Sequence, residues 1–194
     1  MKKRTTMLAL LLATGAGTCL QAQEKLTQFK VRDAITVRTP IMNDSINPKG
    51  EKYADKDLLK TPVVLDLADA PFQVLSTDTA GVLSFPKAEK DHSIYLLETS
   101  LRAERFMTGK LKVTSPARWE IFINGESKMS KENAEDSISG ASTREVNLRL
   151  EPEADYEITI KLLSGSKDKA VPTLKCELIK DDKFQSSHAV PEFI

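Results

Sequence analysis

The strongest constraint on the fold of this 194-residue chain is an alternation of apolar and polar residues that recurs through its second half. Successive side chains of a β-strand point to opposite faces of a sheet, so a period of two is typical of strands with one buried face. The clearest segments are residues 110–114, 119–123, 146–150, 156–162 and 174–178. Shorter candidates are residues 63–67, 72–75 and 82–85. The pattern therefore predicts many short strands.

Two local signals refine this prediction. Residues 94–97 carry apolar side chains at both parities, which is typical of a strand buried on both faces. Asn124-Gly125 follows the strand predicted at 119–123, and both residue types tolerate the positive φ that a type I′ hairpin turn requires. We therefore expect a central strand at 94–97 and a hairpin that turns at Asn124-Gly125.

Together these features predict an all-β fold, an antiparallel β-sandwich of jelly-roll or galactose-binding-like type with about eight strands. We expect the sandwich to span residues 62–180, with an exposed loop or a helical turn in the polar stretch 127–142. Residues 23–61 are rich in Lys, Asp, Asn and Pro, and we expect a leader or linker, mostly irregular, with one edge strand within 29–37. Residues 181–194 are expected to form a C-terminal tail.

The first segment, residues 1–22, has the parts of a secretory signal peptide. A basic start precedes an apolar run at residues 7–16, and Ala22 supplies the small residue before the predicted cleavage site. The run is shorter than the roughly 20 residues that a transmembrane helix needs. No second long apolar stretch follows, so an integral membrane span is not expected. We expect export to the periplasm or the cell envelope.

Cys19 leaves a second interpretation open, in which the chain is a lipoprotein acylated at this cysteine. Thr18 is a poor residue at the position before a lipidated cysteine, which favours cleavage after Ala22. Cleavage there would leave Cys176 as the one cysteine. The domain would then fold without an internal disulfide, although an oxidising compartment would permit one.

Charge excludes one class of partner. The chain carries 28 basic and 28 acidic residues, and loss of the basic start of the signal peptide would leave a small acidic excess. A general nucleic-acid binder needs a basic face that neutralises phosphates. We therefore expect no nucleic-acid partner.

No catalytic constellation is recognisable in the sequence. The Gly-x-Ser-x-Gly elbow of hydrolases is absent, and neither His92 nor His188 has a partner at metal-ligand or triad spacing. Cys176 lies on the apolar parity of its segment, which favours a small buried side chain over a nucleophile. No Asp-x-Asp-x-Asp-Gly loop offers calcium ligands. We therefore expect no enzyme activity, no metal site and no cofactor.

Three aromatic residues, Tyr95, Trp119 and Phe122, are the candidate ligand-binding residues, because aromatic faces can stack on sugar rings. Trp119 shares its parity with aliphatic neighbours, which favours core packing. Tyr95 and Phe122 lie on the opposite parity and are the better candidates for an exposed ring or for a contact with a second core. Exposure of two coplanar rings would indicate sugar binding, and burial would argue against it.

Three Asp-Ser/Thr-apolar triplets resemble the acceptor pattern for O-linked glycosylation of exported proteins in some Gram-negative bacteria. Their hydroxyl residues are Ser45, Thr79 and Ser137. Such triplets also arise by chance, so the alternative is an unmodified chain. We treat the three residues as candidate glycosylation sites.

The chain also resembles the N-terminal region of exported bacterial peptidases of the prolyl oligopeptidase family. The resemblance lies in a signal that ends in Gln-Ala-Gln, a charged leader, SIYLLETSLRAERFMTGKLKVTSPARWEIFINGE (residues 93–126) and LEPEADYEITIKLLSG (residues 150–165). It implies a jelly-roll sandwich of the kind that precedes a β-propeller and an α/β-hydrolase catalytic domain in that family. Neither of those domains is present in this sequence, so no catalytic residue is carried over.

Two functions follow as expectations. The first is a non-catalytic exported accessory domain that docks onto a protein partner, either the peptidase domain that the resemblance implies or another subunit. The second is a carbohydrate- or glycan-binding module, because sandwiches with exposed aromatic rings bind sugars. The strand that ends at Ile123-Asn124-Gly125 also resembles those of galactose-binding-like sandwiches.

Overall fold

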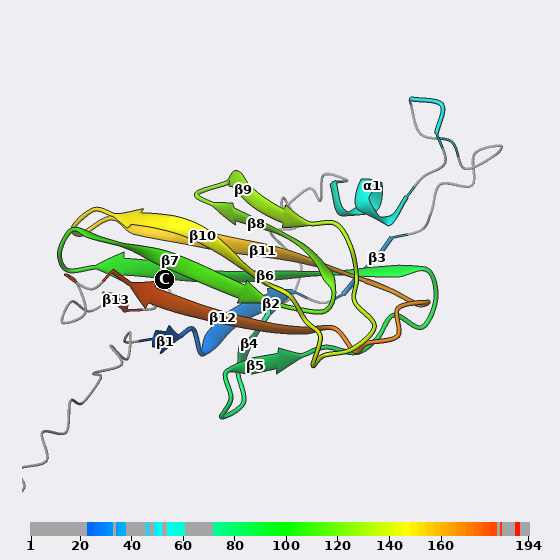
Figure 1. The fold of residues 1–194 in the computed structure, drawn as a ribbon, viewed down its shortest axis with the longest axis horizontal. Helices are drawn as coiled ribbons and strands as arrows, with labels where there is room; N and C mark the ends of the chain where they lie inside the picture. Colours follow the sequence, from blue (N-terminus) through cyan, green and yellow to red (C-terminus); the bar gives the residue numbers. More distant parts are fainter. Residues whose placement is uncertain are drawn as a thin grey trace, which may run out of the picture.

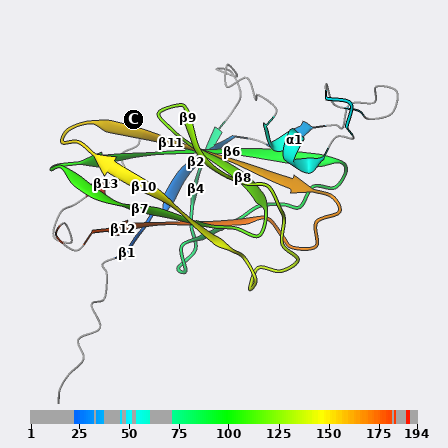
Figure 2. The same ribbon diagram turned by 45° about the horizontal axis from the view of Figure 1, so that its top comes forward.

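Two antiparallel sheets face each other and enclose one hydrophobic core (Figures 1 and 2). The structure, a computed structural model, describes residues 23–32, 34–37, 46, 49–51, 54–60, 72–181, 183 and 189–190. The expectations for the signal peptide, for Cys19, for the strand at 63–67, for Ser45 and for His188 lie outside these residues.

The smaller sheet has five strands in the order β1–β12–β7–β10, with β5 also paired to β12. Its strands are β1 (Gln23–Lys25), β5 (Val82–Ser84), β7 (Met107–Thr114), β10 (Thr143–Leu150) and β12 (Thr173–Lys180). Strands β7 and β10 keep the alternation seen in the sequence. On β10, for example, Val146, Leu148 and Leu150 are buried and the residues between them are exposed.

The larger sheet has eight strands in the order β4–β2–β6–β11–β8–β9, and β3 and β13 also pair with β6. Its strands are β2 (Gln28–Arg32), β3 (Ile35–Val37), β4 (Phe72–Ser76), β6 (His92–Ala103), β8 (Arg118–Ile123), β9 (Glu126–Lys131), β11 (Asp155–Gly165) and β13 (Ala189–Val190). Successive strands often belong to different sheets: β10 and β12 both pair with β7 of the smaller sheet, whereas β11 pairs with β6 and β8 of the larger one.

The main core lies between the two sheets. Trp119, Ile121 and Ile160 fill it from the larger sheet, and Leu111 and Cys176 fill it from the smaller one. Removal of this apolar surface from water stabilises the fold by about 1.5–3 kcal/mol for each large aliphatic or aromatic side chain. The core therefore joins the sheets without a disulfide, since the one cysteine of the described residues is free and buried.

A second, smaller core covers the outer face of the larger sheet. The short helix α1 (Asp55–Lys60) buries Leu58 and Leu59 there against Ile94 and Leu96 of β6 and Leu163 of β11 (Figure 1). Its acidic residues lie in the first turn and Lys60 lies in the last, which suits the helix dipole. The prediction that residues 94–97 form a central strand buried on both faces is confirmed.

The predicted fold class, an antiparallel β-sandwich, is confirmed, but the strands are more numerous than expected, and the main ones are longer than the segments that predicted them. The described residues contain thirteen strands, whereas the alternation predicted about eight. The hairpin turn is also confirmed, because Asn124 and Gly125 have φ of 51° and 76° between β8 and β9. Residues 126–131, most of them expected to be loop or helical turn, form β9.

The expectation of a mostly irregular leader at residues 23–61 is wrong for its described part. This part contains β1, β2, β3 and α1, and Leu26 and Phe29 belong to the main core. These strands have three to five residues each and pair with β12, β4 and β6, which are distant in the sequence. Segments this short acquire their structure from long-range pairing, which a local pattern does not reveal.

Gly109 on β7 offers a test of the close packing between β7 and β12. A Cβ at this position would clash with the backbone oxygen of Ile179, and the pairing of β12 with β7 keeps that oxygen from moving away. We expect Gly109→Ala to lower the free energy of unfolding by about 1–3 kcal/mol, in the range of other overpacking substitutions. Gly140→Ala is the control, because its nearest contact is Ser137 Oγ at 3.5 Å. A change within about 0.5 kcal/mol is expected there. Equal effects of the two substitutions in urea-unfolding curves would contradict this packing.

Candidate functional site

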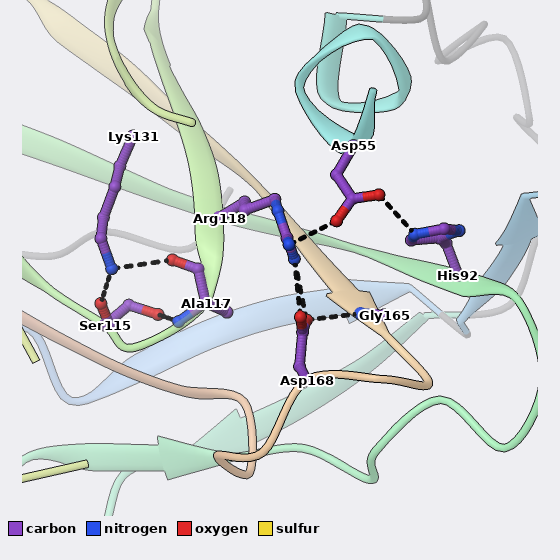
Figure 3. Close-up of polar contacts among 8 residues, drawn as sticks. All are labelled: Asp55, His92, Ser115, Ala117, Arg118, Lys131, Gly165 and Asp168. Atoms are coloured by element: carbon purple, nitrogen blue, oxygen red, sulfur yellow. Dashed lines mark hydrogen bonds and ion pairs between the residues drawn. The ribbon is translucent and has the colours of Figure 1, made fainter. Parts of the chain in front are cut away.

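Arg118, at the start of β8, lies at the centre of a network of charged side chains near the edge of the second core (Figure 3). Its side chain is only 11% exposed. Nη1 donates to both carboxylate oxygens of Asp168 at 2.9 Å, and Nη2 forms an ion pair with Asp55 Oδ2. The guanidinium therefore joins two carboxylates that come from separate segments of the chain.

His92, at the start of β6, extends this network on the other side of Asp55. Its Nε2 lies 3.1 Å from Asp55 Oδ1, and Figure 3 shows the aspartate between the imidazole and the guanidinium. Asp168 also accepts a hydrogen bond from the Gly165 amide at 2.7 Å, at the end of β11. We call Asp55, His92, Arg118 and Asp168 the Arg118 cluster.

The chemistry available to the Arg118 cluster is limited. A histidine paired with a carboxylate is two-thirds of a catalytic triad, but the triad needs a nucleophile that hydrogen-bonds the imidazole. Among the described residues, His92 Nδ1 is buried without a hydrogen-bond partner, and no serine or cysteine occupies that role. The ion pairs of the cluster therefore hold two segments against β8. Asp55 connects α1 to this strand, and Asp168 connects the segment that follows β11.

Lys131 forms a second buried polar contact, at the end of β9 (Figure 3). Its Nζ donates to the backbone oxygens of Ser115 at 2.6 Å and Ala117 at 3.2 Å, and to Glu135 Oε2 at 2.9 Å. Burial lowers the pKa of Lys131, and the hydrogen bond and charge of Glu135 oppose this shift. Three acceptors satisfy the three donors of the ammonium, so the arrangement is structural.

The three aromatic residues predicted to bind a ligand do not form a common platform. Trp119 is fully buried in the main core. Tyr95 belongs to the same core, with its ring centroid 4.8 Å from that of Phe85 and its hydroxyl bonded to the Pro86 oxygen. The expectation that Tyr95 offers an exposed ring or a contact with a second core is therefore corrected. Phe122 alone keeps a partly exposed ring, and its role in binding stays a prediction.

The remaining polar candidates occupy ordinary positions. Cys176 is buried, and burial raises the pKa of its thiol far above the usual value, which suits a core residue. The described residues contain no group of three histidine, cysteine or acidic side chains placed to hold a metal ion. Within the same part of the chain, no helix has the length and apolar character needed to cross a membrane.

The candidate glycosylation residues Thr79 and Ser137 both lie on exposed turns or loops. Ser137 hydrogen-bonds Ser139 Oγ and the Gly140 amide, and the Ile138 side chain beside it is 53% exposed. A modifying enzyme could therefore reach both hydroxyl groups. Whether either carries a glycan stays a prediction.

Strand β4, predicted from residues 72–75, lies at the surface at one end of the larger sheet, a position that the sequence pattern did not indicate. It pairs with β2, and within the described part of the chain no strand lies on its other side. Phe72 and Val74 share one face of β4 and are 53% and 55% exposed. Lys30 of β2 packs over the Phe72 ring, with Nζ 5.5 Å from its centroid. We call Phe72–Ser76 the β4 edge.

Two other outermost strands, β9 and β10, carry features that discourage strand pairing. Charged side chains and bulges protect natural sheet edges against the addition of further strands. The opposite edge of the larger sheet, β9, carries Glu126 and Lys128, and its register shifts opposite Ile121 and Phe122 of β8. In the smaller sheet, β10 exposes Arg144, Glu145 and Arg149. The β4 edge, with the sequence FQVLS, contains no charge and no register shift.

Comparisons with known proteins leave the family of this chain open. No protein-family model and no curated protein matches it. Among solved structures, a β-glucosidase from Kluyveromyces marxianus in complex with glucose is similar over 82% of this chain and 17% of its own, at 9% identity and a TM-score of 0.47. The chain thus corresponds to a small part of that enzyme.

Two isolated domains are similar over more of their own length. The PA14 sugar-binding domain from an RTX adhesin matches with 12% identity, 86% and 96% coverage of the two chains, and a TM-score of 0.47. The PA14 domain of the MpAFP antifreeze protein matches with 11% identity, 87% and 92% coverage, and a TM-score of 0.41. Likenesses this distant transfer neither a ligand nor an activity to this chain.

Arg118→Met tests whether the Arg118 cluster stabilises the fold. The substitution leaves the carboxylate of Asp168, only 13% exposed, without its cation, and we expect the free energy of unfolding to fall by about 2–3 kcal/mol. Arg149→Met is the control, because the Arg149–Glu151 pair is solvent-exposed and should contribute less than about 1 kcal/mol. Chemical denaturation of both variants measures the difference. If Arg118→Met were as stable as the Arg149→Met control, the Arg118 cluster would have no structural role.

Glycosylation is tested by the intact mass of the chain purified from the organism that encodes it. We expect an increment over the polypeptide mass that falls in Thr79→Ala and Ser137→Ala, because each loses an exposed acceptor hydroxyl. Ser139→Ala is the control, since this serine is also exposed but does not follow an aspartate. An unshifted mass of the wild-type chain would rule out modification at both residues.

Proposed function

We propose that this chain is a non-catalytic accessory domain of the cell envelope that docks onto another protein by strand addition at the β4 edge. The observation that carries the proposal is the exposure of Phe72 and Val74 on an uncharged edge strand. In strand addition, backbone hydrogen bonds along a sheet edge provide affinity and alternate side chains provide specificity. The β4 edge offers both kinds of contact.

The polar groups of the described residues support a binding role over catalysis. In the Arg118 cluster, each carboxylate is engaged by a cation, and the Lys131 ammonium is engaged by three acceptors. Active sites need groups held ready for a substrate. Here the charged groups hold secondary-structure elements together.

The resemblance to the N-terminal region of prolyl oligopeptidase family peptidases supports the same proposal. A sandwich that precedes a catalytic domain serves that domain by contact, which requires an exposed surface with apolar side chains. On this proposal, the peptidase part or another subunit contributes the strand that pairs with β4.

A glycan is the second candidate ligand, and the observation that favours it is the partly exposed ring of Phe122. In the sheet register, Phe122 lies between the buried Thr159 of β11 and the exposed Ser127 of β9, so one exposed hydroxyl group lies beside the aromatic ring. This arrangement could contact one sugar ring. A glycan array tests it, and a hit that disappears in Phe122→Ala would favour this function.

Photo-crosslinking tests docking at the β4 edge. The crosslinking residue p-benzoylphenylalanine would replace Val74 in the full chain, expressed in the organism that encodes it. Matched variants would carry it at Ile138, which is as exposed as Val74, and at Lys128 on the β9 edge. We expect an adduct of defined mass with a protein at position 74 and none at positions 138 and 128.

The adduct would be identified by mass spectrometry. An adduct with a peptidase or with a second copy of this chain would each support docking at β4. Equal adducts at all three positions, or none at position 74, would overturn the proposal.

A further inference from the structure

We infer that the strand which adds to the β4 edge comes from a second copy of this chain, so that two molecules pair their β4 strands antiparallel about a two-fold axis. This inference rests on the proposed function and names its partner. A two-fold axis through the edge places Val74 opposite the partner's Val74. The two larger sheets would then become one continuous sheet.

The β4 edge is complementary to itself. An antiparallel pair centred on Val74 places Phe72 opposite the partner's Ser76, so each large ring meets a small side chain. Gln73 lies opposite the partner's Leu75 on the other face. Like charges directly opposite each other destabilise a strand pair, and the β4 edge contains none. Two copies can therefore approach without repulsion between their edges.

The nearest basic side chains would also tolerate the contact. Lys30 and Arg32 of β2 lie opposite Val74 and Phe72. Across the new interface, the two β2 strands would be three strand spacings apart, roughly 14 Å. This exceeds the Debye length of about 10 Å at 0.1 M ionic strength, so repulsion between the two β2 strands is largely screened.

The same geometry predicts a weak, reversible dimer. The contact consists of a five-residue strand pair and the apolar side chains Phe72 and Val74. Interfaces at the low end of the size range belong to transient complexes. The dimer should therefore form at high protein concentration and dissociate on dilution.

Sedimentation velocity over a range of concentrations of residues 23–194 tests this inference. We expect wild type to associate reversibly, and Val74→Lys to associate at least about tenfold more weakly, because two lysines would face each other. Val74→Glu should show the same loss. An equimolar mixture of the Lys and Glu variants should regain association, since position 74 pairs with itself and the charges become opposite.

Ile138→Lys is the control, because it adds the same charge at an equally exposed position outside the β4 edge, and it should associate like wild type. Val74 is half exposed, so the variants should fold, and circular dichroism and thermal unfolding check this. A wild type that stays monomeric at all concentrations would overturn the inference. So would a Lys and Glu mixture no better associated than either variant. Either result, together with a crosslink from position 74 to a different protein, would leave the proposed function intact.

Discussion

The structure depends on the antiparallel pair formed by β6 and β11 at the centre of the larger sheet. The two strands run side by side from His92 opposite Gly165 to Arg102 opposite Asp155. Apolar side chains point to both faces of this pair, so both faces must be covered. The smaller sheet covers one face and closes the main core. Helix α1 covers part of the other, and the Arg118 cluster holds it there through Asp55.

Much of this architecture could be predicted from the sequence, because it follows from local patterns. The alternation on β7, β8, β10 and β12 marked their buried faces, the doubly apolar residues 94–97 marked the central strand, and Asn124-Gly125 marked the hairpin. What could not be predicted depends on contacts between distant segments. Strands β1, β2 and β3 form only against partners far along the chain. Asp55 and Arg118 likewise meet only because α1 packs across β8 and β11.

The predicted site illustrates the same limit. The parity of Trp119 correctly predicted that it lies in the core. Tyr95 lies on a strand whose two faces are both buried, so its parity could not predict whether its ring is exposed. The β4 edge, on which the proposed function rests, was predicted as a short strand, but its local pattern does not indicate that the strand lies at a sheet edge. Its significance comes from the position of β4 at the end of the larger sheet and from its contrast with the charged edges β9 and β10.

The central claim is that the β4 edge is open on one side in the isolated molecule and pairs with the β4 edge of a second copy at high concentration. Residue-resolved amide hydrogen exchange at rising protein concentration tests it most directly, because exchange reports opening and pairing of individual amides. The account predicts that alternate amides of residues 72–76 exchange rapidly in dilute solution and gain protection at high concentration. Those of β9 should not change. Full protection of the β4 amides in dilute solution, or rapid exchange at every concentration, would contradict it.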